Sequence, residues 1–295
     1  MAMTVEFTGL YTALLTPFKD GEIDADTFQS FIEWQIEQGV HGIVPCGTTG
    51  ESPTLTHEEH IRAVDLAIEA AAGKVKVMAG AGSNSTAEAI AFTQHAKQAG
   101  ADAVLLVSPY YNKPSQEGLY QHYTAIADAV EIPQFIYNIP GRSVINVTDE
   151  TLARLSKHAN IAGVKDATGD LARVSSLRAL IGDELPLLSG EDLTAPGFNA
   201  QGGKGCISVT SNIAPKICAD VQTACLEGDY VKALELHQSI VPLHQAMFCE
   251  TNPIPVKYAA SLMGKMRDEI RLPLTLPYAA SQERIKQALQ DAGLL

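Results

Sequence analysis

Residues 103–108 read Ala103-Val104-Leu105-Leu106-Val107-Ser108, an almost unbroken run of apolar side chains that ends in a serine. A strand with one face in water alternates apolar and polar residues, whereas a strand of a parallel sheet is apolar on both faces because helices cover both sides. The run therefore predicts a buried strand of a parallel sheet. Since parallel strands need long crossover connections, we expect helices between this strand and its neighbours.

Seven more runs of this kind occur along the chain, and amphipathic segments separate them, which is the βαβα pattern of an α/β fold. Helical periodicity is clearest over residues 25–38 and 56–72, and hydroxyls that can cap further helices stand at Ser85 and Ser115. Eight such units predict a closed (β/α)8 barrel, or TIM barrel, and the alternative is an open doubly wound sheet. The predicted strands are residues 10–17, 42–47, 75–80, 103–108, 133–138, 161–165, 185–190 and 205–210.

The remainder of the chain carries no strand pattern and reads as helical. No flexible linker separates it from the barrel. The sequence therefore predicts a barrel catalytic domain over residues 1–212 and a C-terminal helical extension over residues 213–295. Within the extension we expect helices over residues 214–226, 230–245, 253–263 and 277–292.

Composition limits the classes of partner. Of 295 residues, 21 are Lys or Arg and 34 are Asp or Glu, so the net charge is −13, and no basic cluster occurs. Nucleic acid and membranes are therefore not expected partners, and an anionic substrate must be bound by local donors. The five cysteines are scattered without a CxxC pair, which favours reduced thiols. With no signal peptide and no apolar stretch of ~18 residues, we expect a cytoplasmic enzyme.

Polar and aromatic side chains gather where the predicted strands end. In a barrel of this type the active site lies at the C-terminal ends of the strands. Since the strand bodies stay apolar, this distribution predicts a site at that rim. The rim segments are Gly47-Thr48-Thr49-Gly50-Glu51-Ser52, Ser108-Pro109-Tyr110-Tyr111-Asn112, Tyr137-Asn138-Ile139-Pro140-Gly141-Arg142, Lys165, Ser189-Gly190-Glu191-Asp192 and Ile207-Ser208-Val209-Thr210.

Lys165 has the most distinctive chemistry of the rim residues. It ends the apolar run Ile161-Ala162-Gly163-Val164. An ammonium group is costly to bury, and burial favours the neutral amine, which is the form that attacks a carbonyl carbon. Lys165 is therefore a candidate Schiff-base lysine, and the alternative is a lysine whose head reaches water from a strand end.

Three neighbouring groups fit the chemistry of such a lysine, although each also has an ordinary structural explanation. The Gly-Thr-Thr-Gly turn at Thr48 can offer backbone N–H groups to a small carboxylate, or it is a plain βα turn. Tyr137 can move a proton at a carbinolamine, or it fills the mouth of the barrel. Arg142 can clamp a carboxylate through contacts worth roughly 1.5–3 kcal/mol, or it is a solvated loop arginine.

Five motifs stand in the order and spacing of the dihydrodipicolinate synthase family, and the chain resembles that family over essentially its whole length. They are Gly-Thr-Thr-Gly-Glu at 47–51, Ser-Pro-Tyr-Tyr-Asn at 108–112, Tyr-Asn-Ile-Pro-Gly-Arg at 137–142, Gly-Val-Lys-Asp-Ala-Thr-Gly at 163–169 and Gly-Cys-Ile-Ser-Val-Thr at 205–210. The family is a branch of the pyruvate-dependent class I aldolases, which include N-acetylneuraminate lyase. The resemblance implies a Schiff-base enzyme of lysine biosynthesis that condenses pyruvate with L-aspartate 4-semialdehyde to 4-hydroxy-tetrahydrodipicolinate. It implies no metal and no organic cofactor.

The resemblance also implies roles for individual residues. Lys165 forms the imine with pyruvate, and the residues that match the proton relay are Tyr137, Thr48 and Tyr111, the last acting across a tight dimer interface. The implied substrate-binding residues are Thr49 for the pyruvate carboxylate, Arg142 for the semialdehyde carboxylate, Ile207 and Gly190. The family implies a homo-oligomer, a dimer of dimers, with L-lysine as a feedback inhibitor. The residues that match its lysine site are Ser52, His57, His60, Asn84, Glu88 and Tyr110.

Other functions stay open. N-acetylneuraminate lyases resemble the chain in the tyrosine and lysine motifs but lack the arginine at the position of Arg142, since their sugar acceptor has no carboxylate to clamp. A flavin- or phosphate-binding oxidoreductase barrel would need a phosphate loop after a strand, whereas the glycine-rich residues 201–205 precede the eighth predicted strand. Zinc at His57 and His60 is disfavoured, because the two are spaced i, i+3 and the HExxH motif needs i, i+4.

Overall fold

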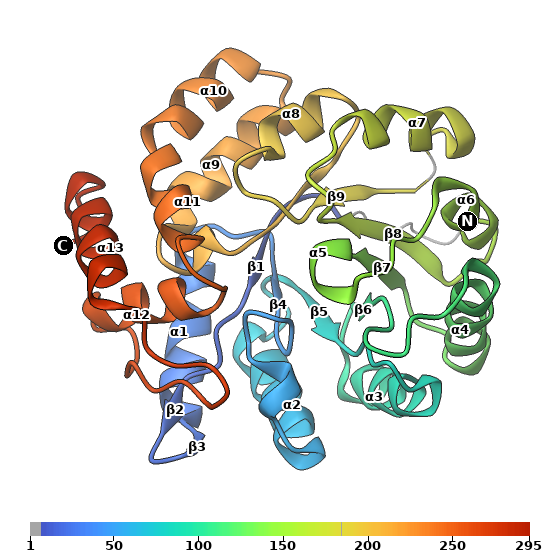
Figure 1. Cartoon of the computed structure of the whole chain (residues 1–295), viewed down its shortest axis with the longest axis horizontal. Helices are drawn as coiled ribbons and strands as arrows, with labels where there is room; N and C mark the ends of the chain where they lie inside the picture. Colours follow the sequence, from blue (N-terminus) through green and yellow to red (C-terminus); the bar gives the residue numbers. More distant parts are fainter. Residues whose placement is uncertain (1–6, 184) are drawn as a thin grey trace.

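The computed structural model describes residues 7–183 and 185–295 of the chain. Its centre is a closed barrel of parallel strands (Figure 1). In this barrel β1 pairs with both β4 and β10. This closure confirms the predicted (β/α)8 fold and excludes the open doubly wound sheet, and every predicted strand overlaps an observed one. The barrel strands are β1 (Gly9–Ala13), β4 (Gly42–Val44), β5 (Lys76–Gly80), β6 (Ala103–Val107), β7 (Gln134–Asn138), β8 (Ile161–Asp166), β9 (Leu187–Ser189) and β10 (Gly205–Ser208).

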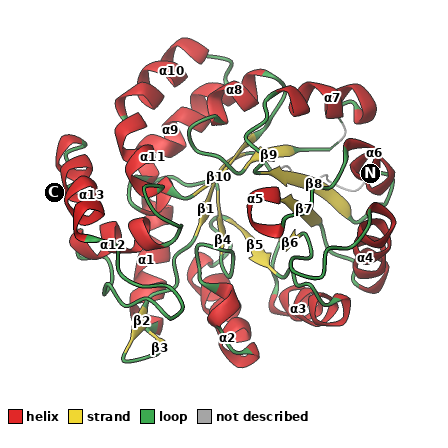
Figure 2. Cartoon of the chain, viewed as in Figure 1, coloured by secondary structure: helices red, strands yellow, loops and turns green. Residues whose placement is uncertain are grey.

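Helices surround the barrel and continue past its last strand (Figure 2). Those between and directly after the strands are α1 (Ala25–Glu37), α2 (His57–Ala71), α3 (Thr86–Ala99), α4 (Gln116–Ala129), α5 (Pro140–Ser143), α6 (Asp149–Leu155), α7 (Ala172–Ile181), α8 (Ala195–Ala200) and α9 (Pro215–Leu226). The later helices are α10 (Tyr230–Ser239), α11 (Val241–Met247), α12 (Ile254–Leu262) and α13 (Ala279–Asp291). Two 3-10 helices, η1 (Ser52–Thr54) and η2 (Thr210–Asn212), follow β4 and β10.

Side-chain caps fix where several of these helices begin. As predicted, the hydroxyls of Ser85 and Ser115 each accept a hydrogen bond from the backbone N–H three residues further on. Thr56 and Glu59 form a reciprocal capping box at the start of α2. These caps satisfy N–H groups that a helix leaves unpaired, so each helix starts close to the strand-end loop that precedes it.

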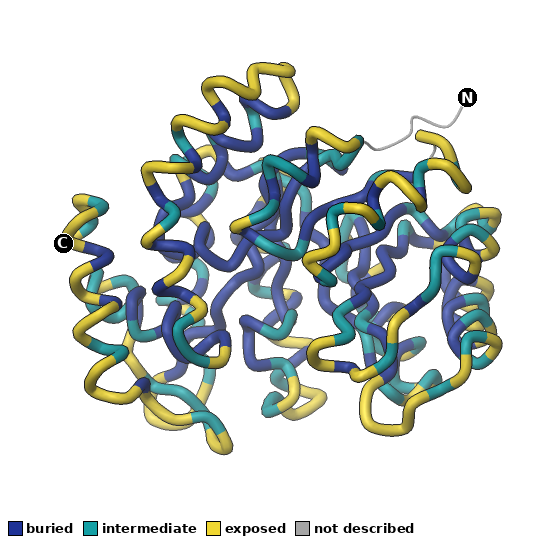
Figure 3. The backbone as a smooth tube through the Cα atoms, turned by 45° about the horizontal axis from the view of Figure 1, so that its top comes forward, coloured by how far each residue is buried: buried dark blue, intermediate teal, exposed yellow. Residues whose placement is uncertain are grey.

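The strands are buried on both faces (Figure 3). One apolar core lies between the sheet and the helices, and a second fills the inside of the barrel. Aromatic rings fill much of this interior: a Cβ added to Gly163 would lie 2.0 Å from Cε1 of Phe135, so only glycine fits beneath that ring. Because apolar side chains fill the body of the barrel, polar groups of the strands and loops lie at its rim.

Two local features differ from the sequence prediction. A short antiparallel hairpin, β2 (Phe18–Lys19) with β3 (Glu22–Ile23), was not predicted, because two-residue strands are too short to show alternation. The single helix predicted over residues 230–245 is wrong, since α10 ends at Ser239 and α11 begins at Val241. Pro242 causes the break: it has no N–H to donate, and its ring would clash with the carbonyl four residues back.

The helices after β10 pack back onto the barrel. α9 contacts β1 and β10, and both α11 and α12 contact η2. The division of the chain at residue 212 into a barrel and an extension stays a prediction. Across residues 7–183 and 185–295, none of the helices combines the length and apolarity that crossing a bilayer requires.

Candidate active site

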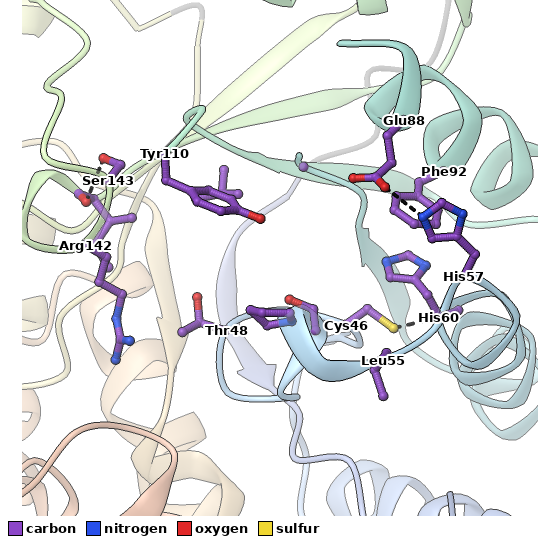
Figure 4. Close-up of a pocket in the computed structure, with 15 residues that line it drawn as sticks. Cys46, Thr48, Leu55, His57, His60, Glu88, Phe92, Tyr110, Arg142 and Ser143 are labelled. Carbon is purple, nitrogen blue, oxygen red and sulfur yellow. Dashed lines mark hydrogen bonds and ion pairs between the residues drawn. The ribbon is translucent and has the colours of Figure 1, made fainter. Parts of the chain in front are cut away.

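A cavity of about 470 Å³ opens among the loops that follow β4, β5, β6 and β7. Thr48 and Arg142 lie at one end, and His57 and Glu88 lie at the other, with Tyr110 between them (Figure 4). One continuous cavity therefore joins residues that the sequence assigned to substrate binding and residues that it assigned to lysine binding.

Lys165 does not itself line this cavity, but Val107 and Ile139, which do, pack against the core that contains its neighbour Tyr137. Lys165 stands on β8 opposite Tyr137 of β7, and its Nζ is 4.0 Å from the centroid of the Tyr137 ring. The residue is only 6% exposed. The adjacent carboxylate of Asp166 is directed to Arg173 Nε at 2.9 Å and to Thr168. Lys165 therefore forms no ion pair with any residue that the structure describes, and its amine is buried against an aromatic face.

Gly190 and Ile207 complete the surroundings of the lysine. A Cβ added to Gly190 would lie 3.1 Å from Lys165 Cε and 2.6 Å from the Cβ of Ala167. The missing side chain thus leaves the space that the lysine stem occupies. Ile207 is fully buried on β10, in the same interior core as Tyr137. The structure therefore brings four of the predicted site residues together at the barrel rim.

The Gly-Thr-Thr-Gly turn follows β4 and is held in a tight conformation. The Gly50 N–H donates to the Gly47 carbonyl at 3.1 Å, and the Glu51 N–H donates to the Thr48 carbonyl at 3.2 Å. Glu51 adopts a φ of 56°, in the left-handed region that a residue with a side chain rarely occupies. The side chain of Thr49 is buried beneath the turn.

Asn252 connects this turn to Arg142. Its Nδ2 donates to Thr49 Oγ1 at 3.1 Å, while its backbone carbonyl accepts a hydrogen bond from Arg142 Nη2 at 2.9 Å. Two of the predicted substrate-binding residues are thus held by one residue from the segment before α12.

Glu191 is an acidic group in the same neighbourhood. Burial raises the pKa of its carboxyl, and the charge of Asp192 raises it further, while the charges of Lys165 and Arg142 act in the opposite direction. The sequence placed Glu191 at the rim without giving it a task.

At the other end of the cavity, Glu88 is the central group. His57 Nε2 lies 2.7 Å from Glu88 Oε1, and the Ser83 hydroxyl donates to the other oxygen. The hydrogen bond from Ser83, helped by His57, holds the pKa of Glu88 below its ordinary value. His60 stacks on Phe92 with ring centroids 3.9 Å apart, and burial lowers its pKa to about 4. This end therefore presents a carboxylate beside a neutral imidazole.

The remaining predicted lysine-site residues lie nearby. Ser52 lines the cavity from η1, and Asn84 Nδ2 donates to the Tyr110 carbonyl at 3.1 Å. Five of the six predicted residues therefore line the cavity, and the sixth, Asn84, is held beside it through the Tyr110 carbonyl.

The model of the dihydrodipicolinate synthetase family matches residues 6–292. The chain belongs to this family. A 4-hydroxy-tetrahydrodipicolinate synthase from Parvibaculum lavamentivorans is 57% identical over 289 residues, covering 98% of this chain and 99% of the relative. Two solved synthases share the fold. That from Acinetobacter baumannii, complexed with pyruvate, has a TM-score of 0.97 at 46% identity, covering 98% and 100% of the two chains. That from Cyanidioschyzon merolae, with lysine bound, has a TM-score of 0.95 at 39% identity, covering 98% and 99%.

Tyr111 is a predicted catalytic residue that the structure places away from the cavity. It is 90% exposed, its φ is 71°, and it does not line the cavity. Among the described residues Tyr111 therefore does not line the cavity, and its action across an interface stays a prediction.

Sequence reasoning missed the contribution of the C-terminal helices to the site. Asn252 contacts Thr49 and Arg142, and Lys257 of α12 forms a buried ion pair with Glu51. A signal was present: the segment Ile254-Pro255-Val256-Lys257-Tyr258-Ala259-Ala260 is apolar on all sides of a helix, so its lysine had to be buried with a partner.

Proposed function

We propose that the chain is a 4-hydroxy-tetrahydrodipicolinate synthase, which condenses pyruvate with L-aspartate 4-semialdehyde in the lysine pathway of the cytoplasm. One observation carries the proposal: the Lys165 amine is buried at the barrel rim, over the Tyr137 ring. Among the described residues this amine forms no ion pair, and a lysine amine can attack the carbonyl carbon of a keto acid. The curated relatives with this activity support the choice of reaction.

The first half-reaction activates pyruvate. The Lys165 amine adds to the carbonyl carbon, and the carbinolamine loses water to give an imine. Tyr137 and Thr48, with Tyr111 of a partner subunit, pass the protons that this exchange requires. The Thr48–Thr49 turn binds the pyruvate carboxylate through its N–H groups and hydroxyls. Loss of a proton from the methyl carbon then converts the imine to a nucleophilic enamine.

The second half-reaction makes the new carbon–carbon bond. The enamine carbon attacks the aldehyde carbon of the semialdehyde, whose carboxylate is held by Arg142. The amino group of the semialdehyde then adds to the imine carbon and displaces Lys165, which closes the ring and frees the enzyme. One water is released overall, in the dehydration of the carbinolamine. Gly190 and Ile207 line the space in which these steps occur.

We further propose that L-lysine binds the far end of the cavity and inhibits the enzyme. The Glu88 carboxylate, held ionised by Ser83, is suited to an ammonium group. A solved relative with lysine bound supports this assignment. Because this end is continuous with the space beside Thr48 and Arg142, an occupant there can influence substrate binding.

The acceptor is tested by measuring pyruvate consumption with L-aspartate 4-semialdehyde and, in parallel, with N-acetylmannosamine. We expect turnover with the semialdehyde alone. Borohydride should trap pyruvate covalently on Lys165 in the wild type and not in Lys165→Ala, which should lose nearly all activity. Turnover with the sugar instead would make the chain a lyase of the neuraminate type. Failure to trap pyruvate on Lys165 would remove the imine mechanism.

The inhibitor is tested by adding L-lysine to the same assay. We expect turnover to fall as the concentration rises into the millimolar range. A flat response over that range would leave the far end of the cavity without an assigned ligand.

A further inference from the structure

Glu51 and Lys257 form an ion pair that is sealed from solvent. Each side chain is 1% exposed, and the pair joins the turn after β4 to helix α12 across 206 residues of sequence. Each of the two groups also makes a further close contact. Glu51 Oε2 accepts the backbone N–H of Arg271 at 3.0 Å, and Lys257 Nζ lies 4.1 Å from the centroid of the Phe18 ring.

Such a pair is a poor source of stability. Removing two charges from water costs about as much as their attraction returns, and well-packed apolar side chains of similar size often serve as well or better. Burial lowers the pKa of Lys257 to about 8 even though Glu51 opposes the change, so the ammonium is less favoured there than it is in water. Unlike apolar side chains, the ion pair is directional, so it fixes the position of the turn after β4 relative to helix α12.

One of those points is the turn that carries Thr48 and Thr49. Glu51 holds a left-handed backbone conformation, and its N–H donates to the Thr48 carbonyl at 3.2 Å. A glutamate is unfavourable there unless its side chain is held from elsewhere. Lys257 holds the Glu51 side chain through the ion pair, so a displacement of α12 would also displace Glu51 and the turn.

Asn252 makes a second connection from the same segment. It lies before α12, and its side chain is buried and donates to Thr49 Oγ1 at 3.1 Å. The two contacts reach the turn at adjacent places, Thr49 and Glu51, on either side of Gly50. The Gly50 carbonyl is bound separately by the Thr16 hydroxyl at 2.8 Å.

We propose that Asn252 and Lys257 are positioning residues for pyruvate: acting through Thr49 and Glu51, they hold the turn in the shape that binds the pyruvate carboxylate. The inference rests on the proposed function, because it takes pyruvate as the ligand of the turn. Neither residue is assigned a contact with substrate. Their effect should therefore appear in pyruvate binding and leave semialdehyde binding nearly unchanged.

The test compares Lys257→Met and Asn252→Ala with the wild type in steady-state kinetics, varying each substrate in turn. We expect the KM for pyruvate to rise about tenfold in Lys257→Met and about threefold or more in Asn252→Ala, since small displacements of a binding group have effects of this order or larger. The KM for the semialdehyde should stay within about twofold, because the backbone carbonyl that binds Arg142 is present in both variants.

Lys216→Met is the matched control. This lysine lies on α9 in an exposed pair with Asp220, so the same chemical change there should leave both KM values as in the wild type. If Lys257→Met does not fold, Glu51→Gln/Lys257→Met removes both charges without leaving one buried alone, and the rise in pyruvate KM is expected in that double variant.

Three outcomes overturn the inference: a wild-type pyruvate KM in a folded Lys257→Met, the same result in the double variant, or an equal change in both KM values. Borohydride trapping separates this failure from failure of the proposed function. Trapping of pyruvate on wild-type Lys165 with unchanged variant KM values would remove only the positioning role. Absence of trapping in the wild type would remove the proposed function itself.

Discussion

In the proposed mechanism the charge of Arg142 has a task in only one of the two half-reactions. Arg142 stands at the cavity end beside Thr48, and Asn252 holds its guanidinium. Arg142→Ala should raise the KM for the semialdehyde about tenfold to a hundredfold, since a charge-assisted contact is worth roughly 1.5–3 kcal/mol. Borohydride trapping of the pyruvate imine should remain near the wild-type level.

Arg267→Ala is a suitable control for Arg142→Ala, because Arg267 pairs with Asp20 at the exposed surface. Semialdehyde kinetics that are the same in Arg142→Ala and in the wild type would remove the reason for preferring the synthase to a sugar lyase.

Gly190 limits the position of Lys165. Gly190→Ala adds a Cβ at 2.6 Å from Ala167 Cβ and 3.1 Å from Lys165 Cε, so the lysine stem or the strand must shift. We expect stability to fall by about 1–3 kcal/mol, as for other overpacked sites, and imine formation with pyruvate to slow at least tenfold. Single-turnover trapping with borohydride measures the second effect. Gly141→Ala, where the added Cβ meets nothing within 4 Å, should change neither quantity by much.

On helix α2, protonation of His60 changes the free energy of unfolding. Burial lowers the pKa of His60 to about 4 from an ordinary value of 6.5, so the folded protein binds fewer protons than the unfolded chain between those values. The contribution of this residue is therefore fully present above about pH 6.5 and is lost as the pH falls toward 4.

The prediction is a midpoint of urea unfolding that decreases from about pH 7 to about pH 4.5, and decreases less in His60→Phe, whose ring can keep the stack on Phe92. His122 on α4 has a pKa lowered to about 4 by the same cause, so part of the decrease should persist. An equal pH dependence in the variant and the wild type would contradict the assignment.

The elements that the sequence predicted are those whose signal is local. Each barrel strand is an apolar run that can be read within a few residues, and the rim residues follow because parallel strands end at one edge. The hairpin of β2 and β3 was too short to show a pattern, and the break before Pro242 was overlooked although the proline itself signalled it. The apolar residues around Lys257 indicated that it is buried, but the partners of Asn252 and Lys257 could not be identified, because Thr49 and Glu51 lie about 200 residues away in the chain.

Because Tyr111 is exposed, we expect two inactive variants to recover activity when their subunits are mixed in one oligomer. Lys165→Ala and Tyr111→Phe should each have very low activity. If Tyr111 acts in the partner's site, a mixed dimer has one complete site, so an equal mixture after subunit exchange should recover about a quarter of wild-type activity. Activity is followed while native mass spectrometry reports the mixed oligomers.

Mixing Lys165→Ala with Tyr137→Phe is the matched control. Lys165 and Tyr137 lie in one site within a chain, so no mixed dimer of these two variants has a site with both residues intact. Mixed oligomers of Lys165→Ala and Tyr111→Phe that stay inactive would place the action of Tyr111 within its own subunit or remove it from catalysis.

The pairing of β1 with both β4 and β10 has a consequence for biosynthesis. The strand made first acquires its second neighbour only after β10 has left the ribosome, and roughly 200 residues take about 10–40 s to translate. During that time one edge of β1 offers unpaired backbone groups to any other extended chain. Slowing translation before residue 205 should therefore increase aggregation of the nascent chain, which sedimentation of the newly made protein would measure.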